Sequence, residues 1–260
     1  MRHVRSADGT SIAYEKTGQG PPLIIIGGAL GDHRFYLPLA GELAKHFTVC
    51  IYDRRGRGQS GDTQPYSVER ELDDVAALIA EAGQPALVYG HSAGSALALR
   101  AAAAGLNIAK LVLADPPYGR HSDADNAARA RQAETAARLQ AFHDQGDHTG
   151  AAAFFLSGFG LPAEAVDELL GSPAGEAMID SARALPYDYA VVGDGLVPDE
   201  LAAQAAVPAL VLAAETALET ARALVEIMPR ATLRSMRASA HDLPPDEIAS
   251  AVTPFFRQEG

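Results

Sequence analysis

The chain has 260 residues, which is enough for one large domain that buries a core without disulfide or metal cross-links. Its 21 basic and 33 acidic residues give a net charge of −12, and such an acidic surface excludes most nucleic-acid-binding proteins because it repels phosphate. One cysteine, Cys50, excludes an internal disulfide, and no apolar run of about 18 residues predicts a membrane span. We therefore expect a soluble cytoplasmic protein in which Cys50 is a small buried apolar residue.

Short apolar runs and helical patterns alternate along the first 117 residues. Two strands around the turn at 7–10 are expected to form an antiparallel hairpin over residues 2–17. Four apolar runs are typical of strands buried on both faces of a parallel sheet: 23–26, 47–52, 87–89 and 110–114. Helical patterns separate them at 35–46, 67–82 and 93–104. The alternation predicts an α/β fold with a mostly parallel, doubly wound sheet.

The segment from Asp53 to Gly61 contains glycines in the G-x-G-x-x-G spacing of a dinucleotide-binding loop. Such a loop opens directly into a helix, whereas here residues 62–65 intervene before helical periodicity begins. The context therefore argues against a nucleotide cofactor. The same segment carries the one tight basic cluster of the sequence, which we interpret as a solvated turn: Arg54, Arg55 and Arg57.

The alternation stops at residue 119, and residues 119–205 contain helical patterns with no convincing strand. The helical patterns cover 122–144, 147–156, 162–170, 173–184 and 187–192. A strand, a helix, a strand and a helix then follow at 209–213, 217–228, 231–236 and 245–257. We predict a helical cap (118–205) inserted after the sixth strand of a core that is formed by 1–117 and 206–260.

A serine flanked by glycines lies where the apolar run 87–89 gives way to a helical pattern. Gly90 and Gly94 surround Ser92 in the pattern G-x-S-x-G. A serine at a sharp strand-to-helix turn adopts strained backbone angles, and the residues two positions away must be small for the turn to close. The turn exposes the hydroxyl and directs free helix N–H groups toward a neighbouring oxygen. We therefore predict that Ser92 is a nucleophile.

A serine nucleophile needs a base to take its proton and an acid to orient that base. His241 follows the last predicted strand, and its loop is expected to return to the sheet edge where Ser92 lies. His91 is next to Ser92, but its side chain is expected to point the other way. His143 and His148 have acidic neighbours, yet their spacing places them on different helical faces, so we predict no metal site.

With these features the chain resembles the α/β-hydrolase fold family, in its serine hydrolase branch with a helical cap. The resemblance covers nearly the whole length and rests on the Gly90–Gly94 pattern, the Asp53-x-Arg-Gly-x-Gly-x-Ser segment, the small-residue loop at 27–31, the cap and the His241 loop. It implies an oxyanion hole made by the backbone N–H groups of Ala29 and Ala93, although Gly27 stands where many members have histidine.

The resemblance leaves the acid of the triad open. Members of the family commonly place an aspartate in the loop after the strand at 209–213, where this chain has Ala217. Glu215 or Glu219 could replace it from the same loop. Asp115, at the end of the preceding strand, occupies the position that some branches use, and its Asp-Pro-Pro sequence is similar to that of other cap-bearing hydrolases. We favour Asp115 and keep Glu215 as the alternative.

The resemblance implies a serine hydrolase that cleaves a carboxylic ester, thioester or lactone through an acyl-enzyme. Aromatic residues in and near the cap favour a small lipophilic substrate, and no cofactor, nucleic acid or membrane partner is expected. The residues expected to contact the substrate are Gly28, Tyr118, Phe154, Phe155, Phe159 and Tyr187. A non-hydrolytic member (a lyase, C–C hydrolase, acyltransferase or cyclase) and a ligand-binding pseudoenzyme remain alternatives. The oligomeric state is left open.

Overall fold

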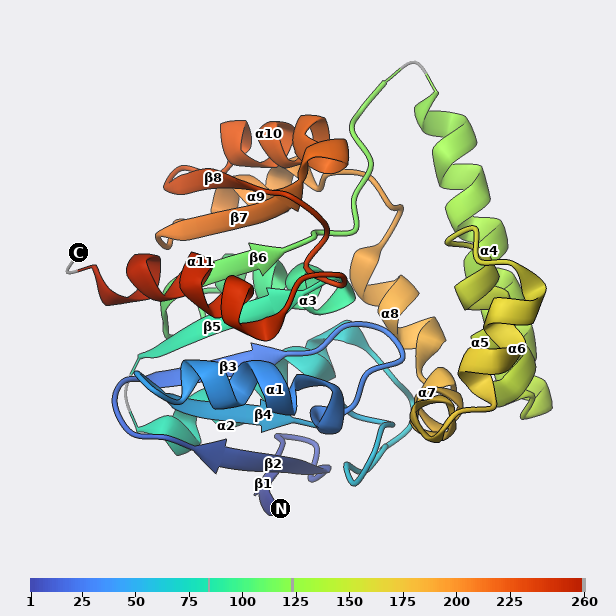
Figure 1. Ribbon diagram of the computed structural model, residues 1–260, viewed down its shortest axis with the longest axis horizontal. Helices are drawn as coiled ribbons and strands as arrows, with labels where there is room; N and C mark the ends of the chain where they lie inside the picture. Colours follow the sequence, from blue (N-terminus) through green and yellow to red (C-terminus); the bar gives the residue numbers. More distant parts are fainter. Residues whose placement is uncertain (84, 123, 259–260) are drawn as a thin grey trace.

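The computed structural model describes residues 1–83, 85–122 and 124–258. Within them, eight strands form one sheet in the order β1-β2-β4-β3-β5-β6-β7-β8 (Figure 1). Strand β1 (Arg2–Arg5) pairs antiparallel with β2 (Ser11–Thr17), which pairs antiparallel with β4 (Thr48–Tyr52). The other neighbours are parallel: β3 (Pro22–Ile26), β5 (Ala86–His91), β6 (Ile108–Ala114), β7 (Ala209–Ala214) and β8 (Ala231–Met236). The α/β fold with a mostly parallel sheet is confirmed.

The central strands are buried because their sequences are apolar throughout. Every residue of β3, β5 and β7 is buried, as expected for strands that are covered by helices on both faces. The register of β5 against β6 pairs His91 with Ala114. The residues that follow these two strands, Ser92 and Asp115, therefore leave the sheet side by side at its carboxyl edge.

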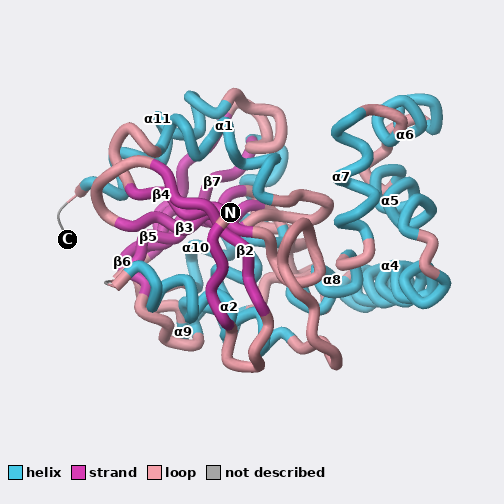
Figure 2. Tube along the Cα trace, turned by 90° about the horizontal axis from the view of Figure 1, so that it is seen from below, coloured by secondary structure: helices cyan, strands magenta, loops and turns pink. Residues whose placement is uncertain are grey.

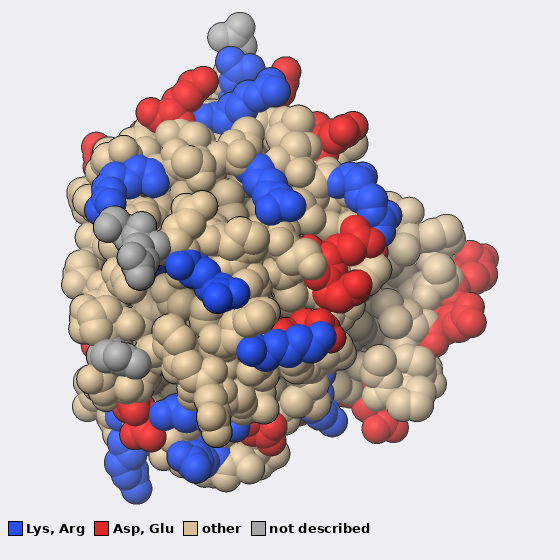
Figure 3. Space-filling view, turned by 60° about the vertical axis from the view of Figure 1, so that its left-hand side comes forward, with Lys and Arg blue, Asp and Glu red and all other residues tan. Residues whose placement is uncertain are grey.

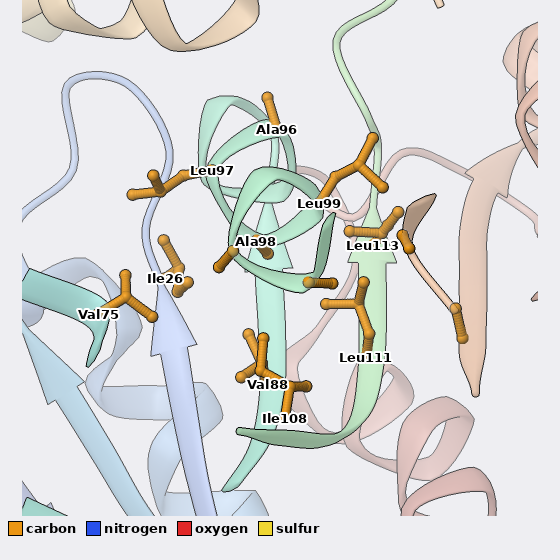
Figure 4. Close-up of a cluster of buried hydrophobic side chains, with 14 of the residues drawn as sticks. Ile26, Val75, Val88, Ala96, Leu97, Ala98, Leu99, Ile108, Leu111 and Leu113 are labelled. Atoms are coloured by element: carbon orange, nitrogen blue, oxygen red, sulfur yellow. The ribbon is translucent and has the colours of Figure 1, made fainter. Parts of the chain in front are cut away.

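Helices cover both faces of the sheet (Figure 2). One face carries α1 (His33–Leu43) and α11 (Pro245–Arg257). The other carries the remaining core helices: α2 (Val68–Ala82), α3 (Ala93–Ala103), α9 (Asp199–Gln204) and α10 (Leu218–Ile227). Figure 4 shows Ala96 and Ala98 of α3 within the cluster that includes Val88 and Leu111 of the sheet. Small side chains on α3 let the helix that begins at Ser92 pack closely on the strands beneath it.

Five helices between β6 and β7 form the block that was expected as a cap: α4 (Asp125–Gln145), α5 (His148–Ser157), α6 (Ala163–Leu170), α7 (Pro173–Ala182) and α8 (Leu185–Val192). Figures 1 and 2 show α4 to α7 standing to one side of the sheet. Position 123, within the first expected cap helix, lies outside the described residues. The short α9 was not anticipated, and it packs against α3 and α10 rather than against the block.

Leu30, from the loop after β3, belongs to an apolar cluster with residues of this block, including Leu139, Leu156 and Leu185. A parallel bridge between Gly119 and Leu196 joins the segments that lead into and out of the block. The block is therefore fixed to the core both at its base and over the loop after β3.

Helix boundaries differ from the expected ones by a few residues. Helix α1 begins at His33 because the Asp32 side chain accepts the backbone N–H of Arg34 and caps the first turn. The helix expected at 217–228 begins with a short 3₁₀ turn, η1 (Glu215–Ala217), before α10. On the face shown in Figure 3, Lys and Arg side chains are interspersed with acidic ones. Among the helices of the described residues, none combines the length and the apolar character that crossing a bilayer requires.

Candidate active site

Ser92 occupies a strained turn between β5 and α3. Its φ of 52° and ψ of −125° lie outside the regions that non-glycine residues favour, and its N–H donates to the carbonyl of Ala114 at 2.9 Å. A Cβ on Gly94 would overlap the carbonyl oxygen of Ile26 at the end of β3, and one on Gly90 would overlap the carbonyl of Gly94. The two glycines thus let α3 approach β3 and permit the turn that carries Ser92.

Asp115 and His241 meet at the same edge of the sheet. Asp115 follows β6 with a φ of 47°, and its Oδ2 accepts the Ser239 hydroxyl at 2.5 Å and the Ala240 N–H at 2.6 Å. His241 lies in the loop between β8 and α11, and its Nδ1 is 3.3 Å from the same Oδ2. Burial raises the pKa of Asp115, but hydrogen bonds from His241, Ser239 and Ala240 outweigh burial and lower that pKa below its usual value.

Ser92, Asp115 and His241 all line one cavity of about 620 Å³. Among the described residues, no hydrogen bond joins the Ser92 hydroxyl to the His241 ring, and such contacts are often longer before substrate binds. Glu215, the alternative acid, is exposed on η1, while Glu219 lies 3.7 Å from Arg120. The structure thus brings Asp115, rather than either glutamate, to the histidine.

Three of the residues expected to contact a substrate line this cavity, namely Tyr118, Phe155 and Phe159. Gly28 lines a smaller adjoining space of about 40 Å³, together with His91 and His241. A Cβ on Gly28 would lie 3.0 Å from the Cβ of Ser92, a tight contact that glycine avoids where the loop passes beside the serine.

Phe154 and Tyr187 were expected at the substrate but lie away from the cavity. The guanidinium of Arg138 is 4.4 Å from the centroid of the Phe154 ring, so that ring is covered by its own helical block. The Tyr187 ring stacks on Tyr66 at 3.8 Å, and its hydroxyl donates to Asp62 at 2.8 Å. Phe154 therefore packs within the helical block, and Tyr187 packs the block against the core.

The two residues expected to supply the oxyanion donors come from the loop after β3 and from the start of α3. Ala29 lines the large cavity, and Ala93 is the first residue of α3, whose N–H has no helical partner. The loop is fixed from behind by side chains: the Gly28 N–H donates to the Tyr36 hydroxyl at 2.7 Å, and the Gly28 carbonyl accepts Arg57 at 2.8 Å. The backbone around Ala29 therefore has a defined orientation.

The interpretation of the arginine cluster as a solvated turn is wrong. Arg54, Arg55 and Arg57 are at most 2% exposed, and each guanidinium is paired with carboxylates. Arg54 and Arg57 each lie 2.6 Å from an oxygen of Asp188 on α8. Arg54 also contacts Glu71, and Arg55 contacts Asp74. Asp188 lies more than 130 positions after Arg54 and Arg57, so the sequence around these arginines does not reveal their partner.

His91 has a defined place beside the site that the sequence did not reveal. Its Nδ1 lies 3.0 Å from the Tyr36 hydroxyl, which also accepts the Gly28 N–H. Its ring centroid is 4.1 Å from that of His241. Burial, together with the neighbouring His241, lowers the pKa of His91 to about 3, although Asp115 acts in the opposite direction. His91 is therefore neutral and links the loop after β3 to the histidine loop.

Two clusters bring possible metal ligands within 4.8 Å of one another: His91, Asp115 and His241, and Asp32, His33 and Asp53. In the first, the Asp115 carboxylate accepts the Ser239 hydroxyl and the Ala240 N–H. In the second, His33 bonds to Asp53 at 2.8 Å and Asp32 to Arg34. These contacts already engage Asp115 in the first cluster and all three side chains of the second.

Comparison with known proteins identifies a family that matches most of the chain. The model of the alpha/beta hydrolase family matches residues 23–252. The uncharacterized hydrolase YraK of Bacillus subtilis is 36% identical over 95 residues, which are 35% of this chain and 35% of that protein. N-formylmaleamate deformylase of Pseudomonas putida is 34% identical over 117 residues, 43% of this chain and 44% of that protein. The matches thus span about a third to less than half of these relatives.

Solved structures extend the likeness to the full length. An alpha/beta hydrolase from Sphaerobacter thermophilus superposes with a TM-score of 0.85 at 39% identity, covering 98% of this chain and 100% of that one. The enol-lactonase of Burkholderia xenovorans superposes with a TM-score of 0.70 at 20% identity, covering 99% and 100%, and so shares the fold. The family match, the sheet order and the Sphaerobacter likeness lead to one conclusion: this chain belongs to the alpha/beta hydrolase family.

Proposed function

We propose that the protein is a serine hydrolase that cleaves a carboxylic ester, thioester or lactone of a small lipophilic substrate through an acyl-enzyme. One observation carries the proposal: Ser92 on its strained turn, Asp115 and His241 line a single cavity, with the carboxylate on the Nδ1 side of the imidazole. This leaves Nε2 free to face the serine, which is the arrangement that activates a hydroxyl.

Each step follows from a group at this site. His241 takes the Ser92 proton as the hydroxyl oxygen attacks the acyl carbon. The N–H groups of Ala29 and Ala93 bind the oxyanion of the tetrahedral intermediate, and one such donor typically contributes about 10²–10³ in rate. His241 then protonates the leaving oxygen or sulfur. Water, deprotonated by His241, attacks the acyl-enzyme and releases the acid and the free Ser92.

The cavity wall supports an uncharged, apolar acyl group. Phe155, Phe159 and Met178 line one side, and Ala213, Ala217 and other small residues line another. Among the described residues, no lysine or arginine lines the cavity, so no permanently cationic side chain there would neutralise a negatively charged substrate. The names of structural neighbours include an enol-lactonase and esterases, which suits this substrate class. We also propose that 118–205 acts as a cap on the core of 1–117 and 206–260.

The proposal is tested by Ser92→Ala, with Ser235→Ala on the exposed side of β8 as the matched control. The native protein and the control should hydrolyse p-nitrophenyl butyrate and be labelled covalently by a fluorophosphonate, whereas Ser92→Ala should do neither. Labelling that persists in Ser92→Ala would remove Ser92 from its role. A folded native protein inert in both assays would instead favour a ligand-binding pseudoenzyme.

A further inference from the structure

A hydroxyl lies between the acid and the histidine of the site. Ser239 is in the loop that links β8 to α11, two residues before His241. Its Oγ is 2.5 Å from Asp115 Oδ2 and 2.9 Å from His241 Nδ1. The direct distance from His241 Nδ1 to Asp115 is 3.3 Å, which exceeds the usual range of an N–H···O bond. The nearest acceptor for Nδ1 is therefore the hydroxyl and not the carboxylate.

The direction of these hydrogen bonds is fixed by the groups involved. An ionised carboxylate can only accept, so the Ser239 hydroxyl gives its single proton to Asp115. The two lone pairs of Oγ then accept the backbone N–H of His241 at 3.2 Å and its Nδ1. Nδ1 must carry a proton to make this bond, so Nε2 bears the lone pair that a base needs.

We propose that Ser239 is a positioning residue that transmits the orienting effect of Asp115 to His241. It acts through the chain Asp115 Oδ2, Ser239 Oγ, His241 Nδ1, and it selects the tautomer of His241 and stabilises the imidazolium formed when Ser92 loses its proton. This inference rests on the proposed function. A serine in a loop also has an ordinary structural role, since its oxygen accepts the His241 N–H and helps form the turn.

Ser239→Ala removes the relay with little change in volume, and Ser239→Thr retains the hydroxyl. Steady-state hydrolysis of p-nitrophenyl butyrate by Ser239→Ala should show kcat reduced on the order of 10- to 100-fold, the range expected when a hydrogen bond to a charged group is lost. KM should change by no more than about twofold because Ser239 orients the base. Ser239→Thr should recover most of kcat, and Ser235→Ala, exposed on β8, should match the native protein.

A second measurement separates the relay from a structural role. In an Asp115→Asn background, Ser239→Ala should lower kcat by less than about threefold, because without the carboxylate Ser239 has no orienting effect to transmit. Equal losses in both backgrounds, or a native kcat in Ser239→Ala, would overturn the inference while Ser92-dependent hydrolysis stands. If Ser92→Ala keeps full activity and labelling, the proposed function itself fails and the relay fails with it.

Discussion

Asp115 is the residue on which the choice of acid depends. Its carboxylate lies 3.3 Å from His241 Nδ1 and accepts the Ser239 hydroxyl, which contacts the same nitrogen. Glu215, in contrast, is exposed on η1. Asp115→Asn should lower kcat for p-nitrophenyl butyrate on the order of 10³–10⁴-fold, because an amide favours the wrong imidazole tautomer. Glu215→Gln, the matched control, should stay within about twofold of the native kcat. A large loss in Glu215→Gln with a small one in Asp115→Asn would reverse the assignment.

His91 predicts how stability depends on pH. Its pKa is lowered to about 3 in the folded protein, first by burial and then by His241, while in the unfolded chain it is near 6.5. Between these two values the unfolded chain binds one more proton, so acid favours unfolding. From about pH 7 to about pH 5 this group should reduce the free energy of unfolding by about 2 kcal/mol.

Urea denaturation of the native protein and of His91→Gln across this range measures the effect. The variant should be less stable at neutral pH, since Tyr36 loses its partner, yet its stability should fall less steeply as the pH drops. Parallel pH dependences in the two proteins would show that His91 does not carry the proton difference.

At the scale of elements, the buried arginines join α8 to the loop that carries Ala29. Asp188 of α8 contacts Arg54 and Arg57, and these two side chains donate to the carbonyls of Gly27 and Gly28. Breaking a buried ion pair by removing one partner leaves a charge that water no longer solvates. The position of α8 is thus coupled to the backbone next to Ser92.

Asp188→Asn should therefore lower the free energy of unfolding by about 3–5 kcal/mol. Asp180→Asn on α7 is the control, because Asp180 is half exposed and its partner Arg183 is 3.6 Å away, so its loss should cost about 0–1 kcal/mol. Urea denaturation at neutral pH compares the two. Similar free energies of unfolding for both variants would show that the buried pair contributes no more than a surface one.

The elements that were predicted correctly are those with local signals. The apolar runs of β3, β5 and β7, the glycines around Ser92 and the interruption of the alternation after β6 are all visible within short windows of sequence. The short α9 was missed because its six residues give too little periodicity. The observed start of α1 differs from the predicted one because the Asp32 side chain caps the helix at His33.

The parts of the site that escaped prediction depend on partners far along the chain. Arg57 reads as a surface charge until Asp188 is placed beside it. Ser239 likewise looks like an ordinary loop serine in the sequence, because the carboxylate that its hydroxyl contacts lies 124 positions earlier. Tyr187 was expected at the substrate from its type and region alone, and only its stacking on Tyr66 shows that it packs α8. Local patterns predict the turn that carries Ser92, but they do not reveal side chains that come close to the site from distant parts of the chain.

At the scale of the whole molecule, charge should select among substrates. The net charge is −12, and among the described residues the acidic and histidine side chains that line the large cavity are Asp115, His241 and Asp242. A field of one sign repels an anion, and salt screens that repulsion. The value of kcat/KM for the anionic ester mono-(p-nitrophenyl) succinate should therefore be lower than for p-nitrophenyl butyrate, which has an acyl chain of equal carbon number.

Raising NaCl from about 10 mM to about 300 mM should increase kcat/KM for the succinate ester and leave that for the butyrate ester nearly constant. Phe159, which is 69% exposed and lines the cavity, is a position where a positive charge can be introduced beside the substrate. Phe159→Lys should raise kcat/KM selectively for the anionic ester, whereas Phe159→Leu should not, because it shortens the side chain without adding charge. Equal salt responses of the two esters would mean that the protein's charge does not reach the cavity, and substrate preference would then depend on shape alone.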